Sequence, residues 1–492
     1  MSDDKNLAKR SFKAASWVLI FQFASQFIQI LLGIFMARLL SPDDYGVLGM
    51  LTIFWAVSQV FINGGFSQAL LQRKDVTQID LSSVFYYNML LSFLCCFLMI
   101  IAAPYIADFY HQPILSKTIM VSAWALPVGA LGSIQHIILG RQLRQGYINA
   151  SKLFGILISG LVALWLAWKG YGVWALVWQT FLATAFGTVF VFMFVRWLPS
   201  LAFSLKALGN LFQFGSKLLV AGLLDSFFVN IYNVTIGKFY SAQTLGYYEQ
   251  ARRYSTLWPH SIQSAISTVL FPAFSKIQDD IPRLRDAFKR ALCVSVFTIV
   301  FPAYLICVLS YPFIELVLTP KWLPCIPYWW LLTCTVVLYP IHVLNLQILN
   351  ARGRSDLFLW LEILKKCLAV VSIGILYFCG LIPMLCFGIF SSCISAYLNS
   401  YYVGKEIKFN LWKQLKSVYF YALLAAASCF VAWGAYRLIY PYSHWTGLIV
   451  PAIIGTVCYL LLNHYFRTPA FIDLVGLLGH KFPGVKRIFH LS

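Results

Sequence analysis

Residues 12–50 read FKAASWVLIFQFASQFIQILLGIFMARLLSPDDYGVLGM and begin with a long apolar run, residues 14–37. A bilayer core about 30 Å thick needs about 20 apolar residues in a helix, and this run supplies them. The run is too long for the apolar part of a cleaved signal, and no small-residue cleavage site follows it, so we expect it to be retained. The stretch therefore predicts a first transmembrane helix.

Composition extends this interpretation to the whole chain of 492 residues. Hydrophobic residues make up 60% and charged residues 11%, and the mean hydropathy is +0.76. Such values are typical of polytopic membrane proteins and exclude an ordinary soluble domain. The fold class we predict is an all-α integral membrane protein. About fourteen spans begin near residues 14, 45, 83, 118, 150, 172, 212, 245, 291, 328, 358, 384, 417 and 447.

Basic residues orient these spans. If the N-terminus is cytoplasmic, 29 of the 37 Lys and Arg residues fall in inner segments and six in outer loops, with Arg252 and Arg253 inside a span. This bias predicts that both termini are cytoplasmic. It also explains the net charge of +20 without a nucleic acid, which would need a clustered basic face. The twelve cysteines form no CxxC pair and have no histidine partner, so we expect neither a metal site nor a disulfide framework.

A second copy of the opening pattern begins 200 residues later. Residues 212–250, FQFGSKLLVAGLLDSFFVNIYNVTIGKFYSAQTLGYYEQ, align with residues 12–50 without gaps. The matching landmarks are Phe12 with Phe212, Ser16 with Ser216, Phe27 with Phe227, Arg38 with Lys238, Ser41 with Ser241 and Gly46 with Gly246. Both copies start after an even number of spans, so we expect two parallel, pseudo-symmetric six-helix bundles. The predicted domains are residues 1–205, residues 206–410, and two extra helices with a cytoplasmic tail in residues 411–492.

Polar residues follow one face of the first span and one face of the seventh. The two sets share the spacing i, i+4, i+7 and i+11, which places each set on one side of a helix. They are Gln22, Gln26, Gln29 and Gly33, and Ser226, Asn230, Asn233 and Gly237, with Asp225 alongside. Amides in hydrocarbon need partners. Two explanations stay open: hydrogen bonds between helices, or matching walls of a hydrated central cavity.

The eighth span contains three charges within YYEQARRYSTLW, residues 247–258. If the helix begins near Leu245 at the outer face, Arg252 and Arg253 lie roughly 10–12 Å deep at about 1.5 Å per residue. Either they extend back to the headgroups, or Glu249 holds them in an intramembrane site. Two guanidinium groups beside one carboxylate match a phosphate or diphosphate, so the second explanation implies an anionic cargo. The aromatic residues of this segment fit either an interfacial belt or stacking on a sugar.

Several segments together resemble the bacterial polysaccharide transporter family, the Wzx-type flippases and colanic-acid-exporter-like proteins of the multidrug, oligosaccharidyl-lipid and polysaccharide exporter superfamily. The resemblance covers roughly residues 10–410. It is carried in order by ARLLSPDDYGVLGM, NGGFSQALLQRKDVTQIDLSSVFYYN, GKFYSAQTLGYYEQARRYSTLWP and LFPAFSKIQDDIPRLRDAF.

The resemblance implies two six-helix bundles in a V around a cationic cavity, in the bacterial cytoplasmic (inner) membrane. It implies a non-enzymatic exporter that moves an undecaprenyl-diphosphate-linked oligosaccharide, an O-antigen, capsule or exopolysaccharide repeat unit, to the periplasmic leaflet. Membrane lipids and polysaccharide assembly enzymes are the implied partners. Related flippases keep basic residues in the first and eighth helices. Arg252 and Arg253 match the eighth, whereas the first helix here carries glutamines.

The expected mechanism is alternating access, without a cofactor. A coupling ion, H⁺ or Na⁺, would be carried by Asp225 or Glu249. One alternative is an ion-coupled multidrug antiporter, which would need a net negative cavity. A further alternative is a membrane glycosyltransferase, polymerase or ligase of the same pathway. Those enzymes need a large periplasmic or cytosolic loop that holds paired carboxylates or a histidine with basic residues, and the longest outer loops, residues 104–117 and 312–327, hold one acid each.

Overall fold

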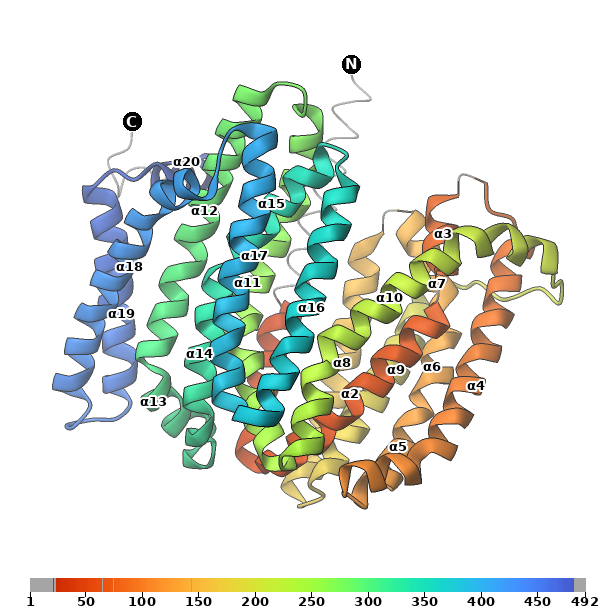
Figure 1. Ribbon diagram of the computed structural model, residues 1–492. Helices are drawn as coiled ribbons and strands as arrows, with labels where there is room; N and C mark the ends of the chain where they lie inside the picture. Colours follow the sequence, from red (N-terminus) through yellow and green to blue (C-terminus); the bar gives the residue numbers. More distant parts are fainter. Residues whose placement is uncertain (1–20, 22–23, 64, 74, 143, 482–492) are drawn as a thin grey trace. The chain divides into compact units, whose positions relative to one another are not determined.

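The computed structural model describes residues 21, 24–63, 65–73, 75–142 and 144–481 (Figure 1). All regular structure in these residues is helical, as the apolar runs predict. The chain divides into two compact units, residues 1–246 and residues 247–492. The domain boundaries predicted at residues 205 and 410 remain predictions.

In the first unit, α8 packs against α9, α4 against α5, and α2 against α10. The helix α4 begins with a capping box at Thr77. The Thr77 hydroxyl accepts from the backbone N–H of Asp80, and the Asp80 carboxylate accepts from the backbone N–H of Thr77. The helices are Ala24–Leu39, α2 (Pro42–Asn63), α3 (Phe66–Gln72), α4 (Gln78–Tyr110), α5 (Ile114–Ala123), α6 (Ala125–Leu131), α7 (Ser133–Arg141), α8 (Gln145–Trp168), α9 (Val173–Phe194), α10 (Leu205–Phe239) and the start of α11 (Ala242–Lys276).

In the second unit, the largest buried cluster joins α12 to α15, α17 and α18 around the fully buried Phe288 and Leu344. The unit holds the rest of α11, α12 (Ile281–Val308), α13 (Ser310–Phe313), the π-helix η1 (Ile314–Leu318), the 3₁₀ helix η2 (Pro320–Cys325), α14 (Ile326–Val337), α15 (Tyr339–Ala351), α16 (Ser355–Cys379), α17 (Leu381–Ile407), α18 (Leu411–Ile439), α19 (Thr446–Tyr465) and α20 (Pro469–Lys481).

Eleven helical segments in the described residues are long and apolar enough to cross a membrane. They correspond to eleven of the predicted spans. The other three predicted spans coincide with Ala24–Leu39, which is shorter, with α11, which is less apolar, and with α16, which carries more charge. The chain is thus a multi-pass membrane protein by length and apolarity, and the total of fourteen spans remains a prediction.

The fourth and the tenth predicted spans are both broken. Residues 114–141 form three helices in series, α5, α6 and α7, and residues 320–351 form η2, α14 and α15. Pro127 and Pro340 lie just after breaks, where a proline removes a backbone donor and interrupts the helical ladder. The apolar runs predict both spans as continuous helices, because hydropathy does not mark such breaks. The two broken spans, the fourth and the tenth, occupy corresponding places in the expected repeat.

The landmarks of the repeat recur in the structure. One helix of each pair ends at Leu39 or Phe239, and the next begins at Pro42 or Ala242. The serine before each second helix caps it in the same way. The Ser41 hydroxyl accepts from the backbone N–H of Asp44 at 3.2 Å, and the Ser241 hydroxyl accepts from that of Thr244 at 3.1 Å. The alignment of residues 12–50 with residues 212–250 therefore matches local structure as well as sequence.

The repeated glycines lie in a reciprocal backbone contact, which we call the glycine crossing (Gly46, Gly246, Pro42 and Ala242). A Cβ atom built on Gly46 would overlap the carbonyl oxygen of Ala242, and one built on Gly246 would overlap the carbonyl oxygen of Pro42. Pro42 and Ala242 are themselves repeat counterparts. The first turns of α2 and α11 therefore approach so closely that only glycine fits at either position.

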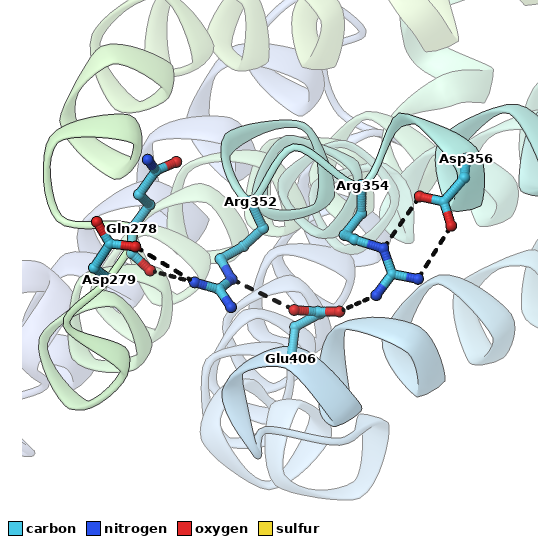
Figure 2. Close-up of polar contacts among 6 residues, drawn as sticks. All are labelled: Gln278, Asp279, Arg352, Arg354, Asp356 and Glu406. Carbon is cyan, nitrogen blue, oxygen red and sulfur yellow. Dashed lines mark hydrogen bonds and ion pairs between the residues drawn. The ribbon is translucent and has the colours of Figure 1, made fainter.

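A charged network fastens one end of the second unit (Figure 2). The Glu406 carboxylate, in the last turn of α17, lies 2.7 Å from Nη1 of Arg354 and 3.4 Å from Nε of Arg352. Arg354 also binds Asp356 with two contacts of 3.1 Å, and Arg352 donates to the carbonyl oxygen of Gln278 at 2.9 Å. The network thus joins α17, the α15–α16 turn and the α11–α12 turn.

We expect Glu406→Gln to destabilise the second unit by about 1–2 kcal/mol, because the carboxylate that accepts from both arginines becomes a neutral amide and its attraction to their charges is lost. The Glu406 side chain is only 14% exposed, so water cannot fully replace the lost interaction. The measurement is the thermal midpoint of the purified protein in detergent. Asp279→Asn is the matched control, since Asp279 is 94% exposed and 4.0 Å from Arg352. Equal midpoints for both variants would contradict a stabilising role for Glu406.

Candidate functional site

The helix α11 carries the charged residues that the sequence singled out. It begins at Ala242, three residues earlier than expected, so Arg252 lies ten residues into the helix, roughly 15 Å from its start. Pro259 lies inside the helix and cannot donate to the carbonyl four residues before it. The hydroxyls of Ser255 and Thr256 both donate to the carbonyl oxygen of Arg252, at 3.1 and 2.7 Å. The charged segment is therefore next to a weak point in the helical ladder.

Glu249 and Arg252 form the ion pair that their spacing predicts. Nη1 of Arg252 lies 3.1 Å from Oε1 of Glu249, and the two side chains are 29% and 24% exposed. Arg253 follows directly and is half-buried. Counted over Glu249, Arg252 and Arg253 alone, the segment holds one carboxylate and two guanidinium groups, which is a net charge of one positive unit. This excess is what an anionic group would need.

The aromatic residues of α11 are mostly occupied within the second unit. The ring of Tyr254 stacks on Trp329 of α14, with centroids 5.4 Å apart and planes at 17°. Tyr247 contacts Trp322 edge-on at 6.1 Å, and Tyr248 is buried. Among the aromatic side chains of residues 247–258, only Trp258 is exposed, at 44%. Stacking on a sugar is therefore available to Trp258 but not to a ring face that Tyr254 already uses.

A stripe of polar residues continues beyond the ion pair. The spacing of Glu249, Arg252, Thr256, His260 and Gln263 places them on one face of α11, and we call this set the α11 polar stripe. The His260 ring stacks on Tyr339 with centroids 4.5 Å apart. Gln263 is 1% exposed, and its amide has no hydrogen-bond partner in the described part of the chain.

Sequence reasoning missed the two buried amides of α11. Gln250, like Gln263, is 1% exposed and lacks a hydrogen-bond partner among the described side chains and backbone. A buried amide without a partner is costly, and such groups call for a functional explanation. The signal is present in the sequence, because glutamines inside a membrane helix also define the polar face of the first span.

The predicted polar face of the seventh span lies on α10, where the asparagine amides have hydrogen-bond partners. In α10, Asn233 is 1% exposed and its amide donates to the Thr52 hydroxyl of α2 at 3.0 Å. Asn230 donates to the carbonyl oxygen of Ser226 at 2.8 Å, within its own helix. Asp225 is exposed. For Asn233, the structure therefore supplies the first of the two explanations, a hydrogen bond between helices.

The polar face of the first span lies on the helix Ala24–Leu39. Gln26 is half-buried and Gln29 is exposed, and Gln22 lies outside the described residues. The candidate residues consequently belong to both units: Gln26, Gln29, Asp225, Asn230 and Asn233 to the first, and Glu249, Arg252 and Arg253 to the second. Within the second unit, the structure joins Glu249 directly to Arg252.

The described residues hold no cluster of three or more His, Cys, Asp or Glu side chains that could bind a metal ion. The cysteines in the described segments are free thiols, and they are spread over several helices. Recognition by charge and hydrogen bonds is available on α11, where Glu249 and Arg252 form an ion pair.

Comparison with known proteins places the chain among polysaccharide biosynthesis proteins. A family described as "Polysaccharide biosynthesis protein" matches residues 35–327, more than half of the chain. The teichuronic acid biosynthesis protein TuaB of Bacillus subtilis is 24% identical over 93% of this chain and 96% of its own length. The lipopolysaccharide biosynthesis protein WzxC of Escherichia coli is 27% identical over 69% of this chain and 70% of its own length.

Solved structures agree on the fold. The lipid II flippase MurJ, in an inward closed conformation, has a TM-score of 0.75 at 16% identity and covers 93% of this chain and 100% of its own. An inward-facing multidrug resistance MATE transporter has a TM-score of 0.57 at 15% identity, over 80% of this chain and 99% of its own. The family match over more than half of the chain leads to one conclusion: the chain belongs to the polysaccharide biosynthesis protein family.

Proposed function

We propose that this protein is a flippase that moves an undecaprenyl-diphosphate-linked oligosaccharide from the cytoplasmic to the periplasmic leaflet of the bacterial inner membrane. The observation that carries the proposal is the net positive segment of Glu249, Arg252 and Arg253 in α11, a helix that we predict to span the membrane. A diphosphate brings the opposite charge and the oxygen spacing that two guanidinium groups bind bidentately. The names of the relatives support a role in polysaccharide assembly, and one relative from Rhizobium meliloti is a succinoglycan biosynthesis transport protein.

The proposed cycle is alternating access. Interrupted helices at corresponding positions of two repeats are typical of transporter binding sites, and the broken fourth and tenth spans fit that rule. The diphosphate binds at Arg252 and Arg253, while the polyprenyl tail stays in the lipid. The buried amides Gln250 and Gln263 supply hydrogen bonds to the polar headgroup as the site opens. Asp225 and Glu249 are the candidate carriers of a coupling proton or sodium ion.

Electrostatics separates this proposal from a drug antiporter. The MATE transporters share the fold, so the fold alone does not choose between an anionic and a cationic cargo. A drug cation would be repelled by the net positive charge of this segment, because like charges repel strongly in a low-dielectric site. We therefore assign an anionic cargo, with both chain termini in the cytoplasm as the basic residues predict.

Deletion of the gene in its source cell tests the function. We expect a surface glycan to be lost while its completed lipid-linked repeat unit accumulates, because assembly continues and export stops. The measurement is mass analysis of extracted lipid-linked oligosaccharides together with a surface glycan assay. Incomplete lipid-linked intermediates would instead indicate an assembly enzyme. Unchanged glycan pools with raised drug sensitivity would indicate an efflux pump, and either result would overturn the proposal.

A further inference from the structure

A second charged site lies in the second unit, on helices other than α11. A cavity of about 800 Å³ opens between the first turns of α12, the start of α18 and the start of α20. Four cations line it: Lys289 and Arg290 from α12, and Lys413 and Lys416 from α18. Two acids, Asp286 and Asp473, also line it, so the cavity carries two excess positive charges. We call it the basic cavity.

The four cations of the basic cavity are not neutralised by the protein itself. None of them forms an ion pair within 4.0 Å in the described part of the chain, although two carboxylates line the same cavity. The Lys413 ammonium donates to the carbonyl oxygen of Lys408 at 3.3 Å, just before its own helix. Glu406, by contrast, is paired with two arginines elsewhere in the second unit. The cavity thus offers unneutralised charge in a formed recess.

The base of the basic cavity is apolar and fixed. Tyr421 is 3% exposed and its hydroxyl accepts from the backbone N–H of Ala470 at 3.2 Å, which attaches the start of α20 to α18. The turn before α20 is held by Arg467 at φ 45°, in the left-handed region, and by the buried Thr468 hydroxyl, which donates to Asn463 at 2.9 Å. These contacts give the recess a defined wall.

The rim of the basic cavity has the features of a membrane interface. Exposed aromatic residues stand on the adjoining helix ends: Trp412, Tyr419, Tyr465 and Phe466. Such rings concentrate at the level of the lipid headgroups. Figure 1 shows α20 at the end of α12, and the two helices are in contact. In α20, Ala470, Phe471 and Val475 are buried in the core cluster of this unit while Ile472 is exposed.

We propose that the basic cavity binds the phosphate headgroup of an anionic membrane phospholipid, such as phosphatidylglycerol or cardiolipin. Recesses with basic side chains between membrane helices bind anionic headgroups, since each Lys or Arg attracts the phosphate and the neighbouring apolar surface accepts the glycerol and the chains. The apolar base and the aromatic rim favour a lipid over a free anion. The basic residues predict that this end faces the cytoplasm, so the lipid belongs to the inner leaflet. The site is independent of the proposed transport site on α11.

Native mass spectrometry of the full-length protein in detergent tests the proposal. Titration with phosphatidylglycerol should give discrete bound states at concentrations where phosphatidylcholine, matched in its chains, gives none. Lys289→Gln with Lys416→Gln should weaken binding of phosphatidylglycerol by about tenfold, because two of the four phosphate-facing charges are lost. The control is Arg283→Gln with Lys405→Gln, which removes the same charge at the same end of the unit outside the cavity, and its affinity should stay within about twofold of the wild type.

Four results would overturn the proposal. The first is equal binding of phosphatidylcholine, and the second is equal weakening by the control pair. The third is preferential binding of undecaprenyl phosphate over phosphatidylglycerol, which would make the cavity a subsite for cargo. Inorganic phosphate at millimolar concentration should not displace the bound lipid. Displacement would be the fourth such result, because it would show a simple anion site. A folded variant is verified by its unchanged elution in size exclusion.

Discussion

Arg252→Gln combined with Arg253→Gln is expected to abolish export of the glycan at wild-type protein levels. Glutamine keeps a hydrogen-bond donor but removes the positive charges. Each charge-assisted hydrogen bond to a phosphate contributes about 1.5–3 kcal/mol, so losing both should lower the affinity for the diphosphate by roughly 100-fold or more. The measurement is surface glycan and accumulated lipid-linked repeat unit in a deletion strain that expresses the variant.

The second unit contains a matched control for this experiment. Lys365 lies 2.8 Å from Glu362 on α16, with the same i, i+3 spacing and side chains that are 26% and 29% exposed. Lys365→Gln should therefore lower the stability of the protein about as much as breaking the Glu249–Arg252 ion pair does. Glycan export should nevertheless persist in this variant. Arg252→Lys with Arg253→Lys should give an intermediate result, since charge is kept while the planar fork is lost. Full export by the double glutamine variant would refute the role of the pair.

Gly46→Ala is expected to prevent accumulation of folded protein, although it adds a single methyl group. The added Cβ would overlap the main chain of Ala242, and no side-chain rotation can relieve a clash with a carbonyl oxygen. The cost should exceed the ~1–3 kcal/mol of ordinary overpacking, because α2 and α11 would have to separate. Gly246→Ala should fail for the reciprocal reason at Pro42. The measurement is monodisperse protein in detergent from a fluorescent fusion.

Gly187→Ala in α9 is the control for the glycine crossing. A Cβ there meets nothing within 4 Å, and alanine is favoured over glycine in a helix by about 1 kcal/mol. Its yield and elution should therefore equal or exceed those of the wild type. Wild-type yield of Gly46→Ala would show that the two helices are not in backbone contact in the folded protein.

The apolar pattern predicts most of the membrane helices because burial in lipid needs only length and apolarity. The predicted starts near residues 45, 172 and 447 lie within three residues of α2, α9 and α19. Spacing also predicts the pair of Glu249 and Arg252, since residues three apart share a helix face. Within α11, residue spacing alone therefore identifies the charged turn.

Other features could not be predicted, because lipid and protein interiors are equally apolar and hydropathy does not say which face meets which. The partner of Asn233 is Thr52, 181 residues away in the sequence, and no residue near Asn233 in the sequence indicates this partner. Tyr254 fits an interfacial belt as well as the packed position that it holds against Trp329. The breaks in the fourth and tenth spans depend on how the freed backbone groups are satisfied by neighbours, which is a tertiary property.

The glycine crossing also bears on how the two halves of this sequence could diverge. Most contacts between side chains can be restored after a mutation by a second mutation in the partner. Here the partner at both Gly46 and Gly246 is main chain, which every amino acid possesses, so no compensating substitution exists. Drift after an internal duplication could therefore erase nearly all similarity between residues 12–50 and 212–250 while leaving these two positions untouched. The geometry of this helix crossing would therefore keep one matching glycine in each half of a sequence that arose by internal duplication.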